Sequence, residues 1–322
     1  MKKLRFIILV LTIYILGSCD APRNNPLDPG NPNNAVRTIS GKVQTISIPF
    51  LPVSAAQVIW ANDNISSATD VNGLFLIETV HDTNGWLLVK KQGYFADSVF
   101  INWSGAKSFD VDVFLNSYPV ADETTLNSSI LFNYPDLQSE QLNVRIRIAD
   151  RDDDVDSVII SNSYSGFHSE LLYNVPMQRY ERSFSIFDLN VLHLEELIGH
   201  AFQLDVHDPF EHRVTVDTPN LVRVIREEIL FTSPSGNDST SSKPILVWKD
   251  YDPGFQHTYM LEVYTAEITP QLVWQTGDVS RDSTEFTVDQ DLSAGDYFWV
   301  IWAIDEFQNR VRSKPASFRV GP

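Results

Sequence analysis

Two histidines and a glutamate in the second half of the chain have a spacing that could bind zinc. The stretch HLEELIGH places His193 and Glu196 three residues apart, with His200 seven residues after the first histidine. A catalytic zinc site also needs a third ligand in an enclosed pocket, and no HExxH motif is present. We therefore favour a short helix or loop between strands, with its leucines turned inward. A zinc peptidase is the minor alternative.

A run of alternating aspartates is the second candidate for ion chemistry, because oxygen ligands suit Ca²⁺. The first three have the spacing of an EF-hand loop. However, Val155 stands where that loop needs glycine, and Ser161 stands where it needs glutamate. The run consists of Asp150, Asp152, Asp154 and Asp156. We predict that these side chains splay into solvent and bind calcium weakly or not at all.

Two further kinds of chemistry have no candidate residues in the sequence. It contains no GxSxG motif for a serine nucleophile and no glycine-rich phosphate loop. Its single cysteine, Cys19, closes an apolar run near the N-terminus. We therefore expect a protein that is not an enzyme and that needs no cofactor, with weak calcium binding as the one open exception.

The segments that would carry these residues have the pattern of short β-strands. From Thr38 onward, alternating polar and apolar residues recur between breaks of Asn, Asp, Gly and Pro. In SFDVDVFL, residues 108–115, Phe109 and Val111 face one way and the aspartates face the other. Period-two alternation is typical of antiparallel β-sandwiches. The predicted fold class is therefore all-β, with three antiparallel β-sandwiches in series after a signal peptide and a flexible tether.

The N-terminus has the layout of an export signal, with a basic head, a short apolar run and small residues. Its exit, LGSC, resembles the lipobox of bacterial lipoproteins. That resemblance implies that residues 1–18 are removed and that the Cys19 thiol carries acyl chains. The alternative is an ordinary signal peptide, or an anchor helix, with a chance cysteine. Residues 19–36 are rich in proline and asparagine, which predicts an extended tether.

Residues 37–118 form the first predicted sandwich. The segments GKV, AQV, TDVNGLF and KQGY resemble the carboxypeptidase regulatory-like domain, whose fold is a transthyretin-like seven-stranded sandwich. In the TDVNGLF turn, Asp70 and Asn72 can bond nearby backbone groups, and Gly73 tolerates a positive φ. These roles make the motif structural, and the resemblance does not imply peptidase activity.

Residues 119–226 and 227–322 form the second and third predicted sandwiches. The hairpin DRDDDVDSV resembles one found in bacterial immunoglobulin-like modules, and LSAGDYFW resembles a strand of fibronectin type III domains. The second resemblance implies that Tyr297 lies at a corner and that Trp299 packs in the core against the tryptophan of an early strand. Alternation from Trp299 places Trp302 on the other side, so we expect Trp302 to be exposed.

The net charge excludes two classes of binding partner. The full chain carries −18 at pH 7, and removing residues 1–18 takes away three positive charges and no negative ones, which leaves −21. Such a field repels phosphate backbones, so we do not expect a nucleic-acid partner. It also disfavours broad adhesion to anionic lipid, which leaves an acyl anchor as the membrane contact.

We therefore predict a membrane-anchored envelope lipoprotein that acts as a non-catalytic interaction or presentation module for an unknown envelope protein or glycan. The outer membrane or the cell surface is favoured over the inner membrane. The first alternative is glycan capture, because the transthyretin-like sandwich is shared with carbohydrate-binding modules and an exposed tryptophan could stack on a sugar. The candidates are Trp60, Trp86, Trp103 and Trp302, with Trp302 the preferred stacking residue. A zinc peptidase is the second alternative.

Overall fold

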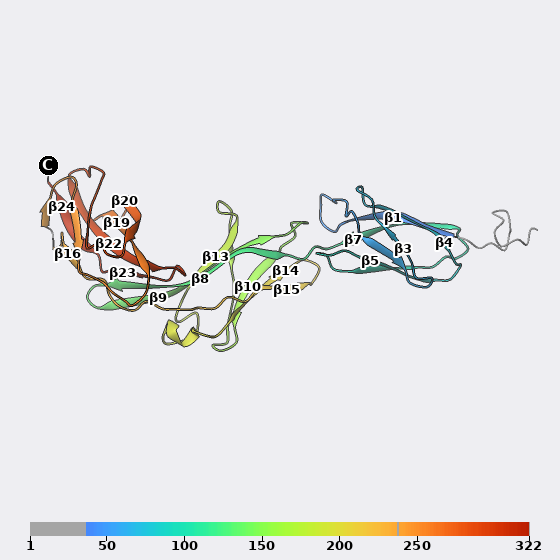
Figure 1. The fold of residues 1–322 in the computed structure, drawn as a ribbon, viewed down its shortest axis with the longest axis horizontal. Coiled ribbons are helices and arrows are strands. Elements are labelled where there is room, and N and C mark those ends of the chain that lie inside the picture. Colours follow the sequence, from blue (N-terminus) through green and yellow to red (C-terminus); the bar gives the residue numbers. More distant parts are fainter. Residues whose placement is uncertain (1–36, 237, 322) are drawn as a thin grey trace, which may run out of the picture. The chain divides into compact units, whose positions relative to one another are not determined.

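The structure is a computed structural model that describes residues 37–236 and 238–321, and it confirms the all-β fold (Figure 1). Contacts divide the chain into two compact units, with the division between Tyr118 and Pro119. The predicted signal peptide, Cys19 and the predicted tether lie outside the described residues. Within the part that is described, no helix is long and apolar enough to cross a membrane.

The N-terminal unit is a sandwich of two sheets around one core. Its strands are β1 (Arg37–Thr45), β2 (Gln57–Trp60), β3 (Ile65–Ala68), β4 (Leu74–Val80), β5 (Gly85–Lys90), β6 (Asp97–Ile101) and β7 (Ser108–Leu115). One sheet has the order β4-β1-β7 and the other β3-β2-β5-β6. Alternation along β1 buries Ile39 and Val43 completely, whereas Ser40 and Lys42 point outward. Most pairs are antiparallel as predicted, but β1 and β7 run parallel.

The TDVNGLF turn joins β3 to β4, and its aspartate has the predicted role. The Asp70 carboxylate accepts hydrogen bonds from the backbone N–H groups of Asn72, at 2.8 Å, and Leu74, at 2.9 Å. Gly73 has a φ of +76°, and a Cβ atom there would lie 2.4 Å from the Val43 carbonyl oxygen. Glycine is required because both the left-handed backbone and the close approach exclude a side chain.

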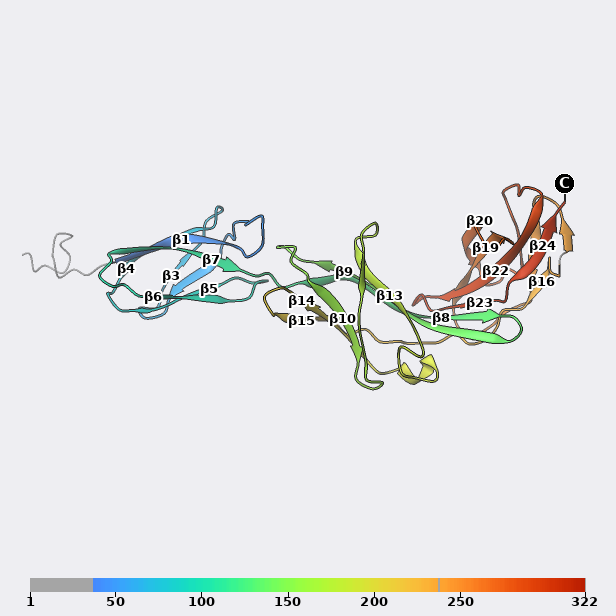
Figure 2. The same ribbon diagram turned by 180° about the vertical axis from the view of Figure 1, so that it is seen from behind.

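The C-terminal unit begins with a long hairpin of β8 (Val120–Asn133) and β9 (Leu137–Ala149) (Figures 1 and 2). The elements that follow are β10 (Ser157–Asn162), β11 (Phe167–Glu170), β12 (Leu172–Asn174), β13 (Arg179–Ser185), the 3₁₀ turn η1 (Leu194–Leu197), β14 (Phe202–His207) and β15 (Arg213–Asp217). β10, β11, β14 and β15 form a four-stranded sheet, while β12 and β13 continue the hairpin sheet beyond β9.

The remaining strands belong to two sheets: most of them extend the hairpin sheet in the other direction, whereas those at residues 231–233, 245–248 and 285–287 form a separate three-stranded sheet. They are β16 (Phe231–Ser233), β17 (Asp238–Thr240), β18 (Ile245–Trp248), β19 (His257–Thr265), β20 (Leu272–Ser280), β21 (Glu285–Thr287), β22 (Gly295–Asp305), β23 (Arg310–Arg312) and β24 (Ala316–Val320). β8 pairs in parallel with β23, so one ten-stranded sheet runs from β12 through β8 to β22 and β20. One hydrophobic cluster likewise continues past residue 226. The second and third predicted sandwiches therefore share a sheet and a core.

The strand LSAGDYFW has two of the features that its fibronectin type III resemblance implies, namely the corner tyrosine and the core tryptophan, while the expected packing of Trp299 against Trp248 stays a prediction. The Tyr297 hydroxyl donates to the carbonyl four residues earlier at 2.9 Å, which is the corner arrangement expected of this tyrosine. Trp299 is fully buried, and Trp248 is also in the core. Trp299 packs edge to face against Phe231, and Trp248 packs against Tyr259.

Candidate functional site

The HxxE motif lies at the 3₁₀ turn η1, where its glutamate has a structural partner. The Glu196 carboxylate accepts hydrogen bonds from two backbone N–H groups at the start of the turn, at 2.8 and 2.9 Å. Leu194 and Leu197 are fully buried, so the prediction of a short turn with inward leucines is confirmed. His200 stacks on the ring of Tyr164 instead of joining the motif, with the ring centroids 4.0 Å apart.

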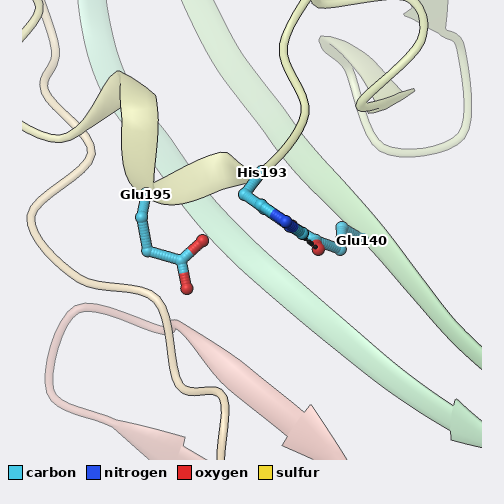
Figure 3. Close-up of side chains that lie close together, drawn as sticks. All are labelled: Glu140, His193 and Glu195. Atoms are coloured by element: carbon cyan, nitrogen blue, oxygen red, sulfur yellow. Dashed lines mark hydrogen bonds and ion pairs between the residues drawn. The ribbon is translucent and has the colours of Figure 1, made fainter.

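A buried glutamate from β9 brings residues near this turn into a cluster that the sequence does not reveal (Figure 3). Ligand atoms of Glu140, His193 and Glu195 lie within 4.8 Å of one another. Arg226 binds both carboxylates: it donates to Glu140 at 2.7 and 2.8 Å and also donates twice to Glu195. Because one guanidinium already supplies the compensating charge, the geometry is that of a structural ion pair rather than a zinc site.

Burial and hydrogen bonding act in opposite directions on Glu140. Its side chain is only 5% exposed, and burial by itself raises the pKa of a carboxyl group. Hydrogen bonds from Arg226, from His193 and from the backbone N–H of Leu194 outweigh burial and lower the pKa of Glu140 to about 2. Hydrogen bonds to the two carboxylates raise the pKa of Arg226 above its ordinary value. The ion pair is therefore fully charged at neutral pH.

The aspartate run gathers its carboxylates, so the prediction that they splay into solvent is wrong. Oxygens of Asp150, Asp152 and Asp154 lie within 4.8 Å of one another, and Asp152 is only 6% exposed. The loop folds back because Asp153 adopts a φ of +53° and because the Asp154 backbone N–H donates to the Asp150 carboxylate at 3.3 Å. Asp156, the fourth member of the run, is not part of this group.

The gathered carboxylates favour a proton on one of them. Burial, a hydrogen bond with Asp150 and the charges of neighbouring aspartates raise the pKa of Asp154 to about 7. Carboxylate oxygens this close together are also the donors that a hard cation such as Ca²⁺ prefers, and cation binding would release the proton. That calcium binds weakly or not at all stays a prediction, which thermal unfolding with and without millimolar calcium tests: a calcium-dependent rise in the unfolding temperature would contradict it.

Three of the four tryptophans considered for sugar stacking are covered by other side chains. Trp60 and Trp103 pack edge to face in the N-terminal core. Trp302 is 9% exposed, so the prediction that it is exposed is wrong. The Arg310 guanidinium lies 4.9 Å from the centre of its ring, and its Nε1 donates to Glu262 at 2.8 Å. Alternation predicts the side on which a residue lies, but it cannot predict which side chains cover that side.

Trp86 is the tryptophan that does reach solvent. It is 50% exposed and packs edge to face against Phe100, which is 51% exposed and lies directly opposite on β6. Leu88 and Ile59 are paired on the same outer side of the sheet and extend this apolar surface across β5 and β2. We call the surface formed by Ile59, Trp86, Leu88 and Phe100 the Trp86 face. The burial of Leu87 and Val89 explains why Trp86 points outward.

No protein-family model matches the chain, and no curated protein matches it. Similar solved structures include fibronectin(III)-like modules of Clostridium thermocellum CbhA, at 11% identity over 63% of this chain and 93% of that chain, with a TM-score of 0.29. BcpA, the major pilin subunit of Bacillus cereus, covers 89% of this chain and 95% of its own at 8% identity and a TM-score of 0.28. The FN1–FN3 domains of chicken CNTN1 cover 84% and 92% at 9% identity, with a TM-score of 0.32. Values this low establish no family.

Proposed function

We propose that this chain is a membrane-anchored envelope lipoprotein that works as a non-catalytic interaction module. The observation that carries the proposal is the Trp86 face, where two aromatic rings stand half exposed on the outer side of a sheet. Contiguous exposed apolar surface is typical of binding sites, because it is unfavourable to leave it in water. The structural roles of Glu140 and Glu196 support a function without catalysis.

The anchoring part of the proposal rests on the N-terminal sequence. The LGSC exit supports acylation of Cys19, and the proline- and asparagine-rich segment after it would hold the folded units away from the membrane. We place the protein at the outer membrane or the cell surface. Its partner is an envelope protein that presents apolar side chains to the Trp86 face.

Glycan capture at the Trp86 face is the second candidate function. The exposed rings of Trp86 and Phe100 favour it, because exposed aromatic rings can stack on sugars. Trp86 and Phe100 are inclined at 66° to each other, so each ring presents its own surface to a ligand. Trp86 therefore replaces the covered Trp302 as the candidate stacking residue.

We expect the double substitution Trp86→Ala with Phe100→Ala to weaken partner binding by at least about tenfold, because central aromatic residues dominate interface energies. The measurement is recovery of partners from envelope extract by the purified full-length protein, together with binding to a glycan array. A protein partner lost in the variant supports the interaction module, and a glycan lost in the variant supports glycan capture.

A matched control is available in the same unit. Phe50 and Phe114 are also partly exposed and in ring contact, with centroids 5.3 Å apart. Replacing both with alanine removes a similar apolar area and should leave binding unchanged. Equal binding by the Trp86 variant and the wild type, or an equal loss in the control, would contradict a role for the Trp86 face.

Cys19→Ser should abolish acylation and leave the precursor uncleaved by the lipoprotein signal peptidase. Serine lacks the thiol that accepts the acyl chain, so metabolic labelling with a fatty acid should be lost from the variant. Normal labelling of Cys19→Ser would rule out the anchor while leaving the proposal for the Trp86 face intact.

A further inference from the structure

A cationic pocket lies on the hairpin sheet of the C-terminal unit, in a chain whose net charge is −18. Its volume is about 230 Å³. It is lined mainly by Glu123, Thr125, Arg145, Arg147, Arg179 and Gln308. Three of these side chains are guanidinium groups, which is unusual for a protein with many more acidic than basic residues.

The strands place these arginines together. Arg145 and Arg147 are two residues apart on β9, so their side chains lie on the same side of the sheet. Val144 and Ile146 alternate with them and are buried in the core on the other side. Arg179 comes from the start of the neighbouring strand, β13. The pocket is therefore on the side of the sheet that faces away from the core.

Only one of the three arginines has an acidic neighbour within hydrogen-bond distance. Arg179 has a close partner, because its Nε donates to Glu181 at 2.7 Å. Arg145 lies 3.9 Å from the same carboxylate, and Arg147 lies 3.7 Å from Glu123. Both distances are beyond hydrogen-bond range, and the two side chains are 36% and 48% exposed, so a ligand can reach them. Their hydrogen-bond donors remain available to a ligand.

We infer that this pocket binds carboxylate groups of an acidic polysaccharide. The planar fork of a guanidinium matches a carboxylate with two parallel hydrogen bonds, and Arg145 and Arg147 present two such forks side by side. Thr125 and Gln308 add a hydroxyl and an amide that can bond sugar hydroxyl groups. The volume is smaller than that of sites which enclose a drug-sized molecule, so the pocket takes one charged unit of a longer chain.

Two observations favour a polysaccharide over an acidic peptide. The side chains that line the pocket offer no exposed aromatic or aliphatic anchor of the kind that dominates protein interfaces. The strand that carries Arg145 and Arg147 is hydrogen-bonded on both sides, by β8 and by β13, so a peptide cannot add to it as a further strand. The arginine pocket shares no residue with the Trp86 face. The proposal for the pocket therefore does not depend on whether the Trp86 face binds a partner.

The test is binding of the purified full-length protein to polygalacturonate, with neutral dextran and poly-L-glutamate as comparison ligands. We expect binding to polygalacturonate that weakens as salt is added, and little binding to the other two. Arg145→Gln with Arg147→Gln should weaken binding by about tenfold for each arginine. If the double variant does not fold, Arg147→Gln alone should give about a tenfold loss.

A charge-matched control separates a local site from a general effect of charge. Arg281→Gln with Arg319→Gln removes the same two charges from ion pairs elsewhere in this unit and should leave binding unchanged. Unchanged binding by the Arg145 and Arg147 variant would overturn the site. Equal binding of dextran would overturn the role of charge, and equal binding of poly-L-glutamate would overturn the assignment to a polysaccharide.

Discussion

Arg226→Met is expected to lower the free energy of unfolding of the C-terminal unit by about 3–5 kcal/mol at pH 7. Methionine keeps much of the volume of the arginine stem but removes the cation. Glu140 would then remain ionised, with a side chain that is only 5% exposed, and Glu195 would lose its partner as well. The loss is large because an unpaired buried carboxylate is much less stable than a buried ion pair.

The pH dependence of this effect has a definite sign. In the wild type, the pKa of Glu140 is lowered from 4.5 to about 2, so ionised Glu140 stabilises the fold above pH 4.5. That contribution is lost as the pH falls from 4.5 towards 2. In Arg226→Met, burial acts without its strongest opposing partner, so protonation of Glu140 relieves the cost. We therefore expect the difference between variant and wild type to shrink at acid pH.

Hydrogen exchange of strand amides measures the free energy of unfolding that Arg226→Met removes, because it reports the stability of each unit separately. Amides of the N-terminal unit serve as the internal reference. Adding Glu140→Gln to Arg226→Met should restore part of the lost stability by removing the buried charge. Arg319→Met breaks only the exposed pair with Asp296 and should have no measurable effect. A loss in Arg319→Met as large as that in Arg226→Met would show that burial of the pair is not the cause.

Gly41→Ala is expected to destabilise the N-terminal unit by about 3 kcal/mol, at the upper end of the cost of overpacking. Gly41 lies on β1, the central strand of its sheet, between β4 and β7. A Cβ atom there would lie 1.8 Å from the Val111 carbonyl oxygen and 3.1 Å from the Phe75 ring. The nearest atom belongs to the backbone of a paired strand, so relief requires the strands to separate.

Gly105→Ala is the matched control for this prediction. Gly105 has a φ of +85°, but an added Cβ would meet no atom within 4 Å. Its substitution should cost only the strain of a left-handed alanine, about 1 kcal/mol. Both values come from hydrogen exchange of the N-terminal strands. Equal losses in the two variants would mean that backbone conformation, and not the contact with Val111, explains the need for glycine at position 41.

Local pattern was sufficient to predict the strands and the side of each strand that faces a core. In β7, Phe109 and Val111 pack against the core whereas Asp110 and Asp112 are exposed, as the alternation predicts. The same holds for the inward leucines of η1. These predictions succeed because side-chain direction along a strand or turn depends only on backbone geometry within a few residues.

The candidate sites were less predictable, because their partners come from distant parts of the chain. Glu140 and Arg226 are 86 positions apart, so the HxxE motif alone could not reveal the ion pair beside it. Alternation placed Trp302 on the correct side of β22 but could not show that Arg310 covers it.

The sequence by itself determined an all-β chain, the TDVNGLF turn and the residues available for chemistry. Only the tertiary structure decided that β8 pairs with β23, that the carboxylates of the aspartate run converge, and that Arg145 and Arg147 meet Arg179 in one pocket. This difference between what the sequence determined and what the tertiary structure decided has a physical cause. Strand formation and side-chain direction are local properties of the backbone, whereas the contacts of a side chain depend on which strands pair, and that choice is made by burial over the whole unit.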